Sequence, residues 1–332
     1  MKEEIAIKLS RRLSERISLT RAKLGASLSA VSDAPATQSK QAMAAMLAYA
    51  KSQALDFEKI VVAAGYPGPR FLLAQQDNLG LTDQQIRRLT YLKRQVAWHL
   101  VLCTVRLKRA YSLYTIDASQ APLPLLKILS DIQRVGRCIT GLTYILTTFY
   151  WKASQILTPS QQDAVRVLLP PVTVASSATP SIQSVDISTL TEVQRHETMK
   201  YFATHSLEFG PRFIATGHPG PRYLLLHAKE LRLTGKQIAA LKPLAFEMEQ
   251  NAANQVQVLK SAYELYAWDV RHPGPDQLQR MQSDIFFTGQ QTIVLASIMI
   301  PTHLSGLSLL TCTQRQVAAH LAAKVQAAEE LI

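Results

Sequence analysis

An internal repeat constrains the fold of this chain more than any other feature of its sequence. The stretch GYPGPRFLLAQQDNLGLTDQQIRRL, residues 65–89, returns as GHPGPRYLLLHAKELRLTGKQIAAL, residues 217–241, at an offset of 152. Further along, LTPSQ at 157–161 returns as LTCTQ at 310–314, at an offset of 153 after one inserted residue. A repeat of roughly 150 residues has the size of one domain. The sequence therefore predicts two tandem units rather than a solenoid of short repeats.

The element Leu-Thr-x-x-Gln occurs five times and has a local physical meaning. A Thr at a helix N-cap accepts a hydrogen bond from the backbone N–H of residue N3, and the Gln at N3 bonds the N-cap N–H in return. Each such capping box predicts a helix start and stabilises it by about 1 kcal/mol. The boxes pair Thr82 with Gln85, Thr158 with Gln161, Thr191 with Gln194, Thr234 with Gln237, and Thr311 with Gln314.

A long amphipathic segment follows the box at Thr82, and another follows the box at Thr234. Apolar residues recur at spacings of three and four from Ile86 to Tyr114, and again from Ile238 to Tyr266. This period predicts one helix of about 30 residues in each half. No segment alternates as a strand would. The predicted fold is all-α, with two tandem helical-hairpin or bundle units of four to five helices each and one long amphipathic helix per unit.

Composition places the boundaries of these units. Residues 1–36 form a basic amphipathic segment, residues 37–168 the first unit, residues 169–188 a linker, and residues 189–332 the second unit. The linker is predicted because PPVTVASSATPSIQS, residues 170–184, is uncharged and rich in Pro, Ser and Thr. Charged residues interrupt any apolar core in the N-terminal segment, so no signal peptide is predicted there. That segment is either a solvated terminus or a helix that docks peripherally on a membrane or a partner.

One segment approaches the composition of a membrane span. No charged residue lies between Asp284 and Arg315, whereas the corresponding part of the first unit carries Arg134, Arg137 and Lys152. Because duplicated units should share one topology, we expect a buried or interface helix here and no transmembrane span.

Basic residues concentrate in the first long helix. The formal net charge is +12, and residues 84–116 contain no acidic residue. Such a surface steers an acidic protein, contacts nucleic acid, or only keeps a helix face solvated. The corresponding helix of the second unit has mixed charge. The candidate client-binding residues are Arg87, Arg88, Lys93, Arg94, Arg106, Lys108 and Arg109.

Motifs for catalysis and cofactor binding are missing from the sequence. We find neither a P-loop nor a dinucleotide fingerprint, neither HExxH nor GxSxG, and so predict no enzyme activity, catalytic residue or cofactor. Three scattered cysteines predict free thiols rather than disulfides or zinc ligands. No two of the eight histidines lie three or four residues apart, and no metal site is predicted. Convergence of His218 and His227, which the first unit lacks, stays open.

The capping boxes before long helices in small basic α-helical units resemble the LTXXQ-motif family of Spy/CpxP-like periplasmic stress chaperones and related heavy-metal sensor proteins. The resemblance covers about residues 37–168 and 189–330. It implies a curved helical hairpin, a cradle-shaped dimer that two units in one chain could form as a pseudo-dimer, and ATP-independent holding of unfolded or acidic client proteins. It also implies the periplasm. Because no export signal is visible, the cytoplasm is the alternative.

Two other functions were weighed against the chaperone hypothesis. One is a stress- or metal-responsive sensor or adaptor that binds a partner protein of a stress pathway. Metal-sensing members of the family carry His, Glu and Met ligands, but the segments 140–155 and 292–306 of this chain contain one His between them. The other is a basic nucleic-acid binder, for which only the charge argues.

Overall fold

The computed structural model describes residues 41, 44–46, 48–49, 57–120, 122–169, 185–207 and 209–329. The chain divides into two units, Met1–Lys51 and Ser52–Ile332. In the first unit only a few residues are described, and they are helical. Every regular element in the described ranges is a helix, which confirms the all-α prediction. The predicted N-terminal segment 1–36 and the core of the predicted linker, residues 170–184, lie outside the described residues.

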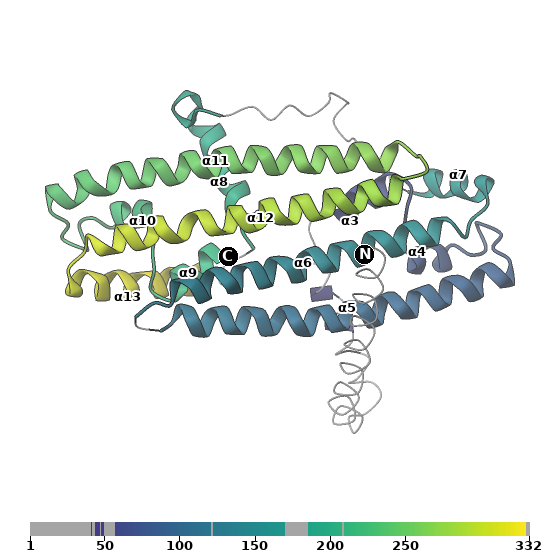
Figure 1. Ribbon diagram of the computed structural model, residues 1–332, viewed down its shortest axis with the longest axis horizontal. Helices are drawn as coiled ribbons and strands as arrows, with labels where there is room; N and C mark the ends of the chain where they lie inside the picture. Colours follow the sequence, from purple (N-terminus) through teal and green to yellow (C-terminus); the bar gives the residue numbers. More distant parts are fainter. Residues whose placement is uncertain are drawn as a thin grey trace, which may run out of the picture. The chain divides into compact units, whose positions relative to one another are not determined.

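Four long helices form a layer within Ser52–Ile332 (Figure 1). They are α5 (Asp83–Ala118), α6 (Leu125–Ser154), α11 (Gly235–Arg271) and α12 (Gln277–Ser308). Helix α5 packs on α6, α6 on α12, and α12 on α11. The helices α5 and α11 contain 36 and 37 residues, longer than the 30 expected, because they continue to the breaks around Pro122 and Pro273.

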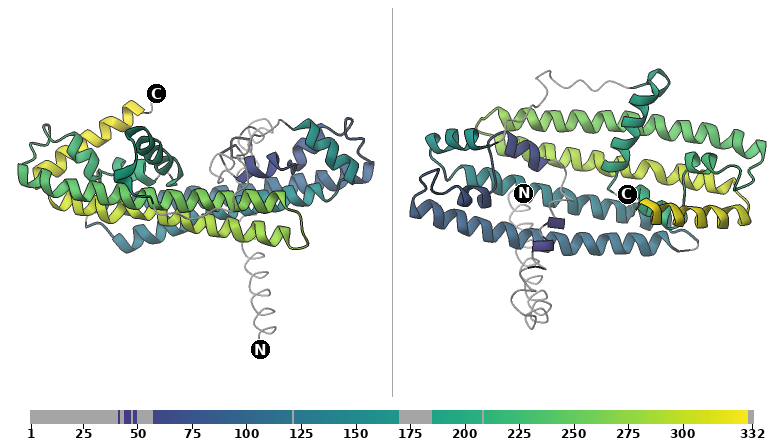
Figure 2. Two further views of the ribbon diagram at one scale, coloured as in Figure 1. Left: turned by 90° about the horizontal axis from the view of Figure 1, so that it is seen from above. Right: turned by 180° about the vertical axis from the view of Figure 1, so that it is seen from behind.

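Shorter helices pack against one face of this layer (Figure 2). From the first half come α3 (Phe57–Ala63), α4 (Pro69–Ala74) and α7 (Pro159–Leu168). The second half contributes η1 (Ile187–Thr189), α8 (Glu192–His205), α9 (Phe209–Ala215), α10 (Pro221–Leu226) and α13 (Cys312–Glu329). The apolar stripes of the long helices face these short helices, and the core lies between them.

The capping boxes also join helices to each other. Both hydrogen bonds of the box form at all five Thr–Gln pairs. In addition, Gln85 Nε2 at the start of α5 donates to Gln161 Oε1 at the start of α7, over 2.8 Å. In the second half Gln237 donates to Gln314 over the same distance. One glutamine therefore caps its own helix and bonds the cap of the neighbouring helix.

Two glycines with different structural roles explain the repeated motif G-[YH]-P-G-P-R. Gly65 and Gly217 have φ of +93° and +89°, which non-glycine residues rarely adopt. Gly68 lies against the ring of Tyr150, where an added Cβ would be 2.6 Å from a ring carbon. Gly220 lies equally close to His303, at 2.5 Å from Nε2. The motif thus turns the chain and lets its backbone pack on a ring of α6 or α12.

Aromatic side chains cross between the halves in a reciprocal way. Phe57 of α3 packs on Tyr266 of α11, with ring centroids 4.2 Å apart, and Phe209 of α9 packs on Tyr114 of α5 at 4.5 Å. Both pairs are related by the sequence offset of 152. All four rings are essentially inaccessible to solvent. Each half therefore inserts a phenylalanine against the long helix of the other.

The contact between α6 and α12 depends on two glycines. A Cβ on Gly136 would lie 2.1 Å from Ile293 Cγ1, and one on Gly289 would lie 2.0 Å from Thr140 Oγ1. Gly136 corresponds to Gly289, and Thr140 to Ile293, at the offset of 153. The two central helices thus approach through a small residue on each side, as close helix packing requires.

By length and composition, α12 is the one helix in the described ranges that could cross a membrane. It lies between α6 and α11, and half of its most apolar window is buried within the protein.

Candidate functional site

All seven basic residues predicted on the first long helix are exposed on α5, but they point to different sides of it. By helical spacing Arg87, Arg94 and Arg109 lie away from the buried stripe, while Arg88 and Arg106, together with Arg87, line hollows at the α5–α6 seam. Of the two lysines, Lys93 is exposed although it falls between the buried residues Leu89 and Val96 at helical spacing, and Lys108 is exposed as well. The structure therefore divides the predicted cluster into separate surfaces. Apart from Lys108, these residues form no ion pair with the described residues of the chain.

One of these surfaces interleaves arginines with exposed apolar side chains. We call it the α5 outer face. Tyr91 is 62% exposed and Trp98 38% exposed, and they alternate with the arginines at helical spacings of three and four. Val105 and Ile116 continue the stripe and are also exposed. In full, the face consists of Arg87, Tyr91, Arg94, Trp98, Val105, Arg109 and Ile116.

Two hollows lie along the seam between α5 and α6. The first, which we call the Tyr91 hollow, has a volume of about 500 Å³. It adjoins the outer face through the shared residues Arg87 and Tyr91. No carboxylate is among the described residues that line it. The lining consists of Arg87, Arg88, Tyr91, Leu92, Lys152, Gln155 and Ile156.

The second, which we call the arginine hollow, has a volume of about 440 Å³. Burial raises the pKa of the Cys138 thiol, while Arg106, Arg134 and Arg137 all act to lower it. Burial likewise raises the pKa of Cys103, against the effect of Arg106. The described lining again contains no carboxylate. It consists of Cys103, Arg106, Ser130, Arg134, Arg137, Cys138 and Gly141.

The sequence-based prediction missed the contribution of α6 to this surface. From the sequence alone, the charges in this segment argue only against a membrane span; they are Arg134, Arg137 and Lys152. They fall on α6 at the seam, where they complete the two hollows. These residues lie close to α5 because α5 and α6 form a hairpin. Spacing along the sequence does not show which residues of two packed helices meet.

The second half carries different residues at the positions of the arginine hollow. Val258, Phe287 and Gln290 stand where the first half has Arg106, Arg134 and Arg137. At the positions of the two cysteines, Gln255 Nε2 donates to Gln291 Oε1 over 2.8 Å across the α11–α12 seam. The same kind of helix pair can therefore close without arginines at these three positions.

A buried carboxylate defines a further hollow of about 830 Å³ in the second half. The Glu249 side chain is 2% exposed, and it accepts hydrogen bonds from Arg195 of α8 and Arg222 of α10. Arg195 Nε lies 2.8 Å from Glu249 Oε2. This ion-paired carboxylate fastens two short helices to α11. The first half has Ala97 at the corresponding position.

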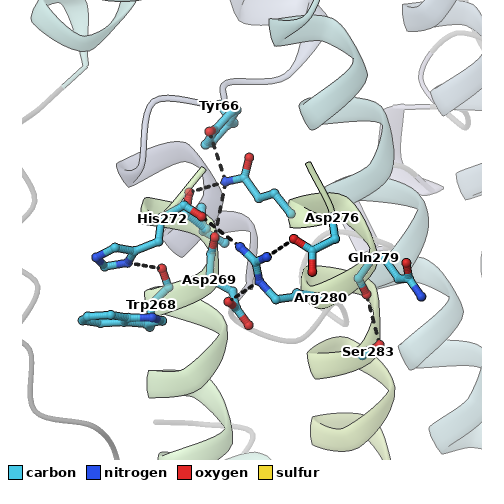
Figure 3. Close-up of polar contacts among 10 residues, drawn as sticks. Tyr66, Trp268, Asp269, His272, Asp276, Gln279, Arg280 and Ser283 are labelled. Atoms are coloured by element: carbon cyan, nitrogen blue, oxygen red, sulfur yellow. Dashed lines mark hydrogen bonds and ion pairs between the residues drawn. The ribbon is translucent and has the colours of Figure 1, made fainter. Parts of the chain in front are cut away.

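Acidic pairs are buried at both hairpin ends. Asp284 of α12 lies near Asp269 of α11, and Asp131 of α6 lies near Asp117 of α5, so that each neighbouring carboxyl raises the pKa of the buried one. Burial, and next the Asp269 carboxyl, raise the pKa of Asp284 to about 7. Figure 3 shows Arg280, which donates from Nε to Asp269 Oδ1 over 2.7 Å and also pairs with Asp276. Burial likewise raises the pKa of Asp131, which accepts a hydrogen bond from Arg134 over 2.7 Å.

The histidines of the second half occupy different surroundings. His218 stacks on Phe213, whereas His227 lies beside Tyr223 and 3.6 Å from Glu230. His303 is buried, with Nδ1 2.8 Å from the backbone oxygen of His218, and burial lowers its pKa to about 4. Within the described ranges no three His, Cys, Asp or Glu side chains gather as metal ligands would.

The α5 outer face and the two hollows together present cations and apolar groups on one hairpin. This arrangement can attract an anionic partner and bury part of its apolar surface. Comparisons with protein-family models, with curated proteins and with solved structures find no match to this chain.

Proposed function

We propose that this protein holds unfolded or stress-damaged proteins without ATP, and that the client contacts the α5 outer face and the adjoining Tyr91 hollow. This is the activity that the resemblance to Spy/CpxP-like chaperones implies. The observation that carries the proposal is the alternation of exposed Tyr91 and Trp98 with arginines that have no carboxylate partner in the described part of the chain.

The physical argument separates encounter from retention. Arginines without a carboxylate partner attract acidic segments over long range and raise the rate of association. Burial of the exposed parts of Tyr91 and Trp98 stabilises the complex by on the order of a few kcal/mol, before the loss of translational freedom is subtracted. The expected complex is therefore weak and reversible, which suits a protein that holds a client and then releases it.

We further propose that residues 37–168 and 189–332 are sister units that form, within one chain, the counterpart of the family's cradle-shaped dimer. The support is that contacts between the halves recur at the offset of the sequence repeat: Phe57 on Tyr266 with Phe209 on Tyr114, and Gly136 against Ile293 with Gly289 against Thr140. Periplasmic residence belongs to the same proposal. Recovery of the native protein in the cytoplasmic fraction would count against it.

Suppression of client aggregation tests the proposal. An acidic client is denatured and diluted, without ATP, into buffer that contains a stoichiometric amount of the protein, and light scattering is recorded. The triple variant Arg87→Ala, Arg94→Ala, Arg109→Ala should lose most of the suppression, and Trp98→Ala should lose part of it. The control of equal charge change is Lys236→Ala, Lys242→Ala, Arg271→Ala on α11, whose three side chains are also exposed. If both triple variants perform equally, the α5 outer face is not the client surface.

Single-stranded nucleic acid is the second candidate ligand, because Tyr91 and Trp98 between arginines also form a stacking surface for bases. Its binding would weaken steeply with salt, whereas retention of an unfolded protein by apolar contacts would not. Fluorescence anisotropy of a labelled oligonucleotide at 50 and 200 mM salt, about the range over which such binding falls sharply, separates the two ligands.

A further inference from the structure

We propose that the arginine hollow is a binding site for a phosphate-class oxyanion. The hollow lies in the α5–α6 seam, and its volume of about 440 Å³ is within the range of small-molecule sites. Its described lining offers three guanidinium groups and the Ser130 hydroxyl. Asp131 is not among the lining residues, but its carboxylate pairs with one of the three guanidinium groups, that of Arg134. This site is separate from the outer face proposed to hold clients.

The charges of the hollow converge on one place. Arg106 comes from α5 and the other two arginines from α6, and all three act on the Cys138 thiol within the hollow. Arg134 is paired with Asp131, but Arg106 and Arg137 form no ion pair with the described residues, so their mutual repulsion raises the free energy of the empty site. A bound dianion removes that repulsion and receives charge-assisted hydrogen bonds.

Two of the arginines are already held in place. Arg134 donates from Nη1 to the buried Asp131 carboxylate over 2.7 Å. Arg137 contacts Gln133, with Nη2 3.3 Å from Oε1. Each guanidinium has five N–H donors, so these bonds leave further donors for a ligand. Arg106 makes no hydrogen bond or ion pair with the described residues, and all of its donors remain available.

Comparison with the second half indicates that the three arginines of the hollow are not required to hold the α5–α6 hairpin together. The α11–α12 seam has Val258, Phe287 and Gln290 at these positions and closes with the Gln255–Gln291 hydrogen bond. Ser283 matches Ser130, so the change is confined to the cations, the thiols and Gly141, which becomes Val294. The arginine hollow is therefore present in the first half although a helix pair of the same kind forms without it in the second half. With Asp131 ionised and paired to Arg134, two of the three positive charges remain uncompensated, and they match a tetrahedral dianion better than a single carboxylate.

The test uses the full-length protein and inorganic phosphate at constant ionic strength, with chloride as the reference anion. Isothermal titration calorimetry should show saturable binding, and the thermal midpoint should rise with phosphate but not with chloride. The double variant Arg106→Val, Arg137→Gln takes both replacements from the second half and leaves the Arg134–Asp131 pair intact. It should bind phosphate at least about tenfold more weakly, since it loses two charge-assisted contacts. A matched control is Lys236→Ala, Lys242→Ala, which should bind as the parent does.

Thiol chemistry supplies a second readout that needs no substitution. Cys103 and Cys138 line the hollow, whereas Cys312 is exposed on α13. Phosphate should slow alkylation of the first two cysteines by iodoacetamide, measured by mass spectrometry, and should leave Cys312 unaffected. O-phosphoserine in place of phosphate tells whether a phosphomonoester enters the hollow as well as the free anion.

The outcomes that overturn the inference are specific. They are the absence of saturable phosphate binding, equal effects of chloride and phosphate, equal weakening in the control variant, or unchanged alkylation of Cys103 and Cys138. The client-holding triple variant retains the arginine hollow, so its loss of chaperone activity would leave phosphate binding in place. Failure of one proposal is therefore distinguishable from failure of the other.

Discussion

Replacement of Asp284 by asparagine should stabilise the protein at neutral and alkaline pH. Asp284 is 7% exposed, and burial and the nearby Asp269 carboxyl both raise its pKa, so the folded protein favours a protonated Asp284. Asparagine has nearly the same shape, and its amide N–H can take the place of that proton. The variant therefore tests the cost of ionising Asp284 without opening a cavity.

The size of the effect follows from the pKa. Burial and the neighbouring carboxyl raise the pKa of Asp284 from 3.8 to about 7. Each pKa unit corresponds to about 1.4 kcal/mol, so ionisation in the folded state costs up to about 4 kcal/mol. Between these two pKa values the folded protein binds more protons than the unfolded chain. Stability therefore falls as pH rises from about 4 to about 7, and the variant should lack this fall.

Urea unfolding followed by circular dichroism at pH 5 and pH 8 measures the difference. We expect the variant to be more stable than the parent by up to about 4 kcal/mol at pH 8 and by only about 1.5 kcal/mol at pH 5, where the parent has lost a smaller part of this stability. Asp163→Asn is the control, because that carboxylate pairs with Arg166 on the surface and is 73% exposed. If the variant is destabilised equally at both pH values, the pKa of Asp284 is not raised in the folded protein.

Further predictions concern packing, ion pairing and capping. Gly289→Ala should cost about 1–3 kcal/mol in urea unfolding, because its Cβ would meet Thr140, whereas Gly141→Ala, with nothing within 4 Å, should be neutral or stabilising. Glu249→Gln should cost about 1–3 kcal/mol, since it leaves two partly exposed guanidinium groups without a carboxylate, and hydrogen exchange of the α8 amides, measured by mass spectrometry, should become faster. Gln85→Ala should cost about 1–2 kcal/mol by thermal unfolding, more than an ordinary cap, because it also removes the bond to the neighbouring helix.

The helical character of the fold could be predicted from the sequence because its causes are local. The capping boxes and apolar periods lie within single helices, and the hydrogen bonds of Thr82 and Thr234 follow from three-residue spacings. The reciprocal packing of Phe57 and Phe209 could not be predicted, since each side chain meets residues of the other half. Sequence spacing determines which residues share a helix face, but not which helix covers that face.

In the candidate site, too, the local features could be predicted from the sequence, whereas the contacts between helices could not. The arginines of α5 were recognisable as a cluster without acidic neighbours. Their division into an outer face and seam hollows depends on where α6 packs, and so does the contribution of Arg134 and Arg137. The acidic pairs were missed for a related reason. Asp269 and Asp284 stand on different helices, and a search at helical spacing does not pair them.

The exchange of phenylalanines between the halves makes each half an incomplete protein. Without Phe209, the ring of Tyr114 would lose the aromatic neighbour that covers it, and Tyr266 would lose Phe57 in the same way. A protease cut within residues 170–184 should therefore yield two fragments that stay together through gel filtration. Either fragment produced alone should dimerise or aggregate, because its uncovered tyrosine lacks the phenylalanine of the other half.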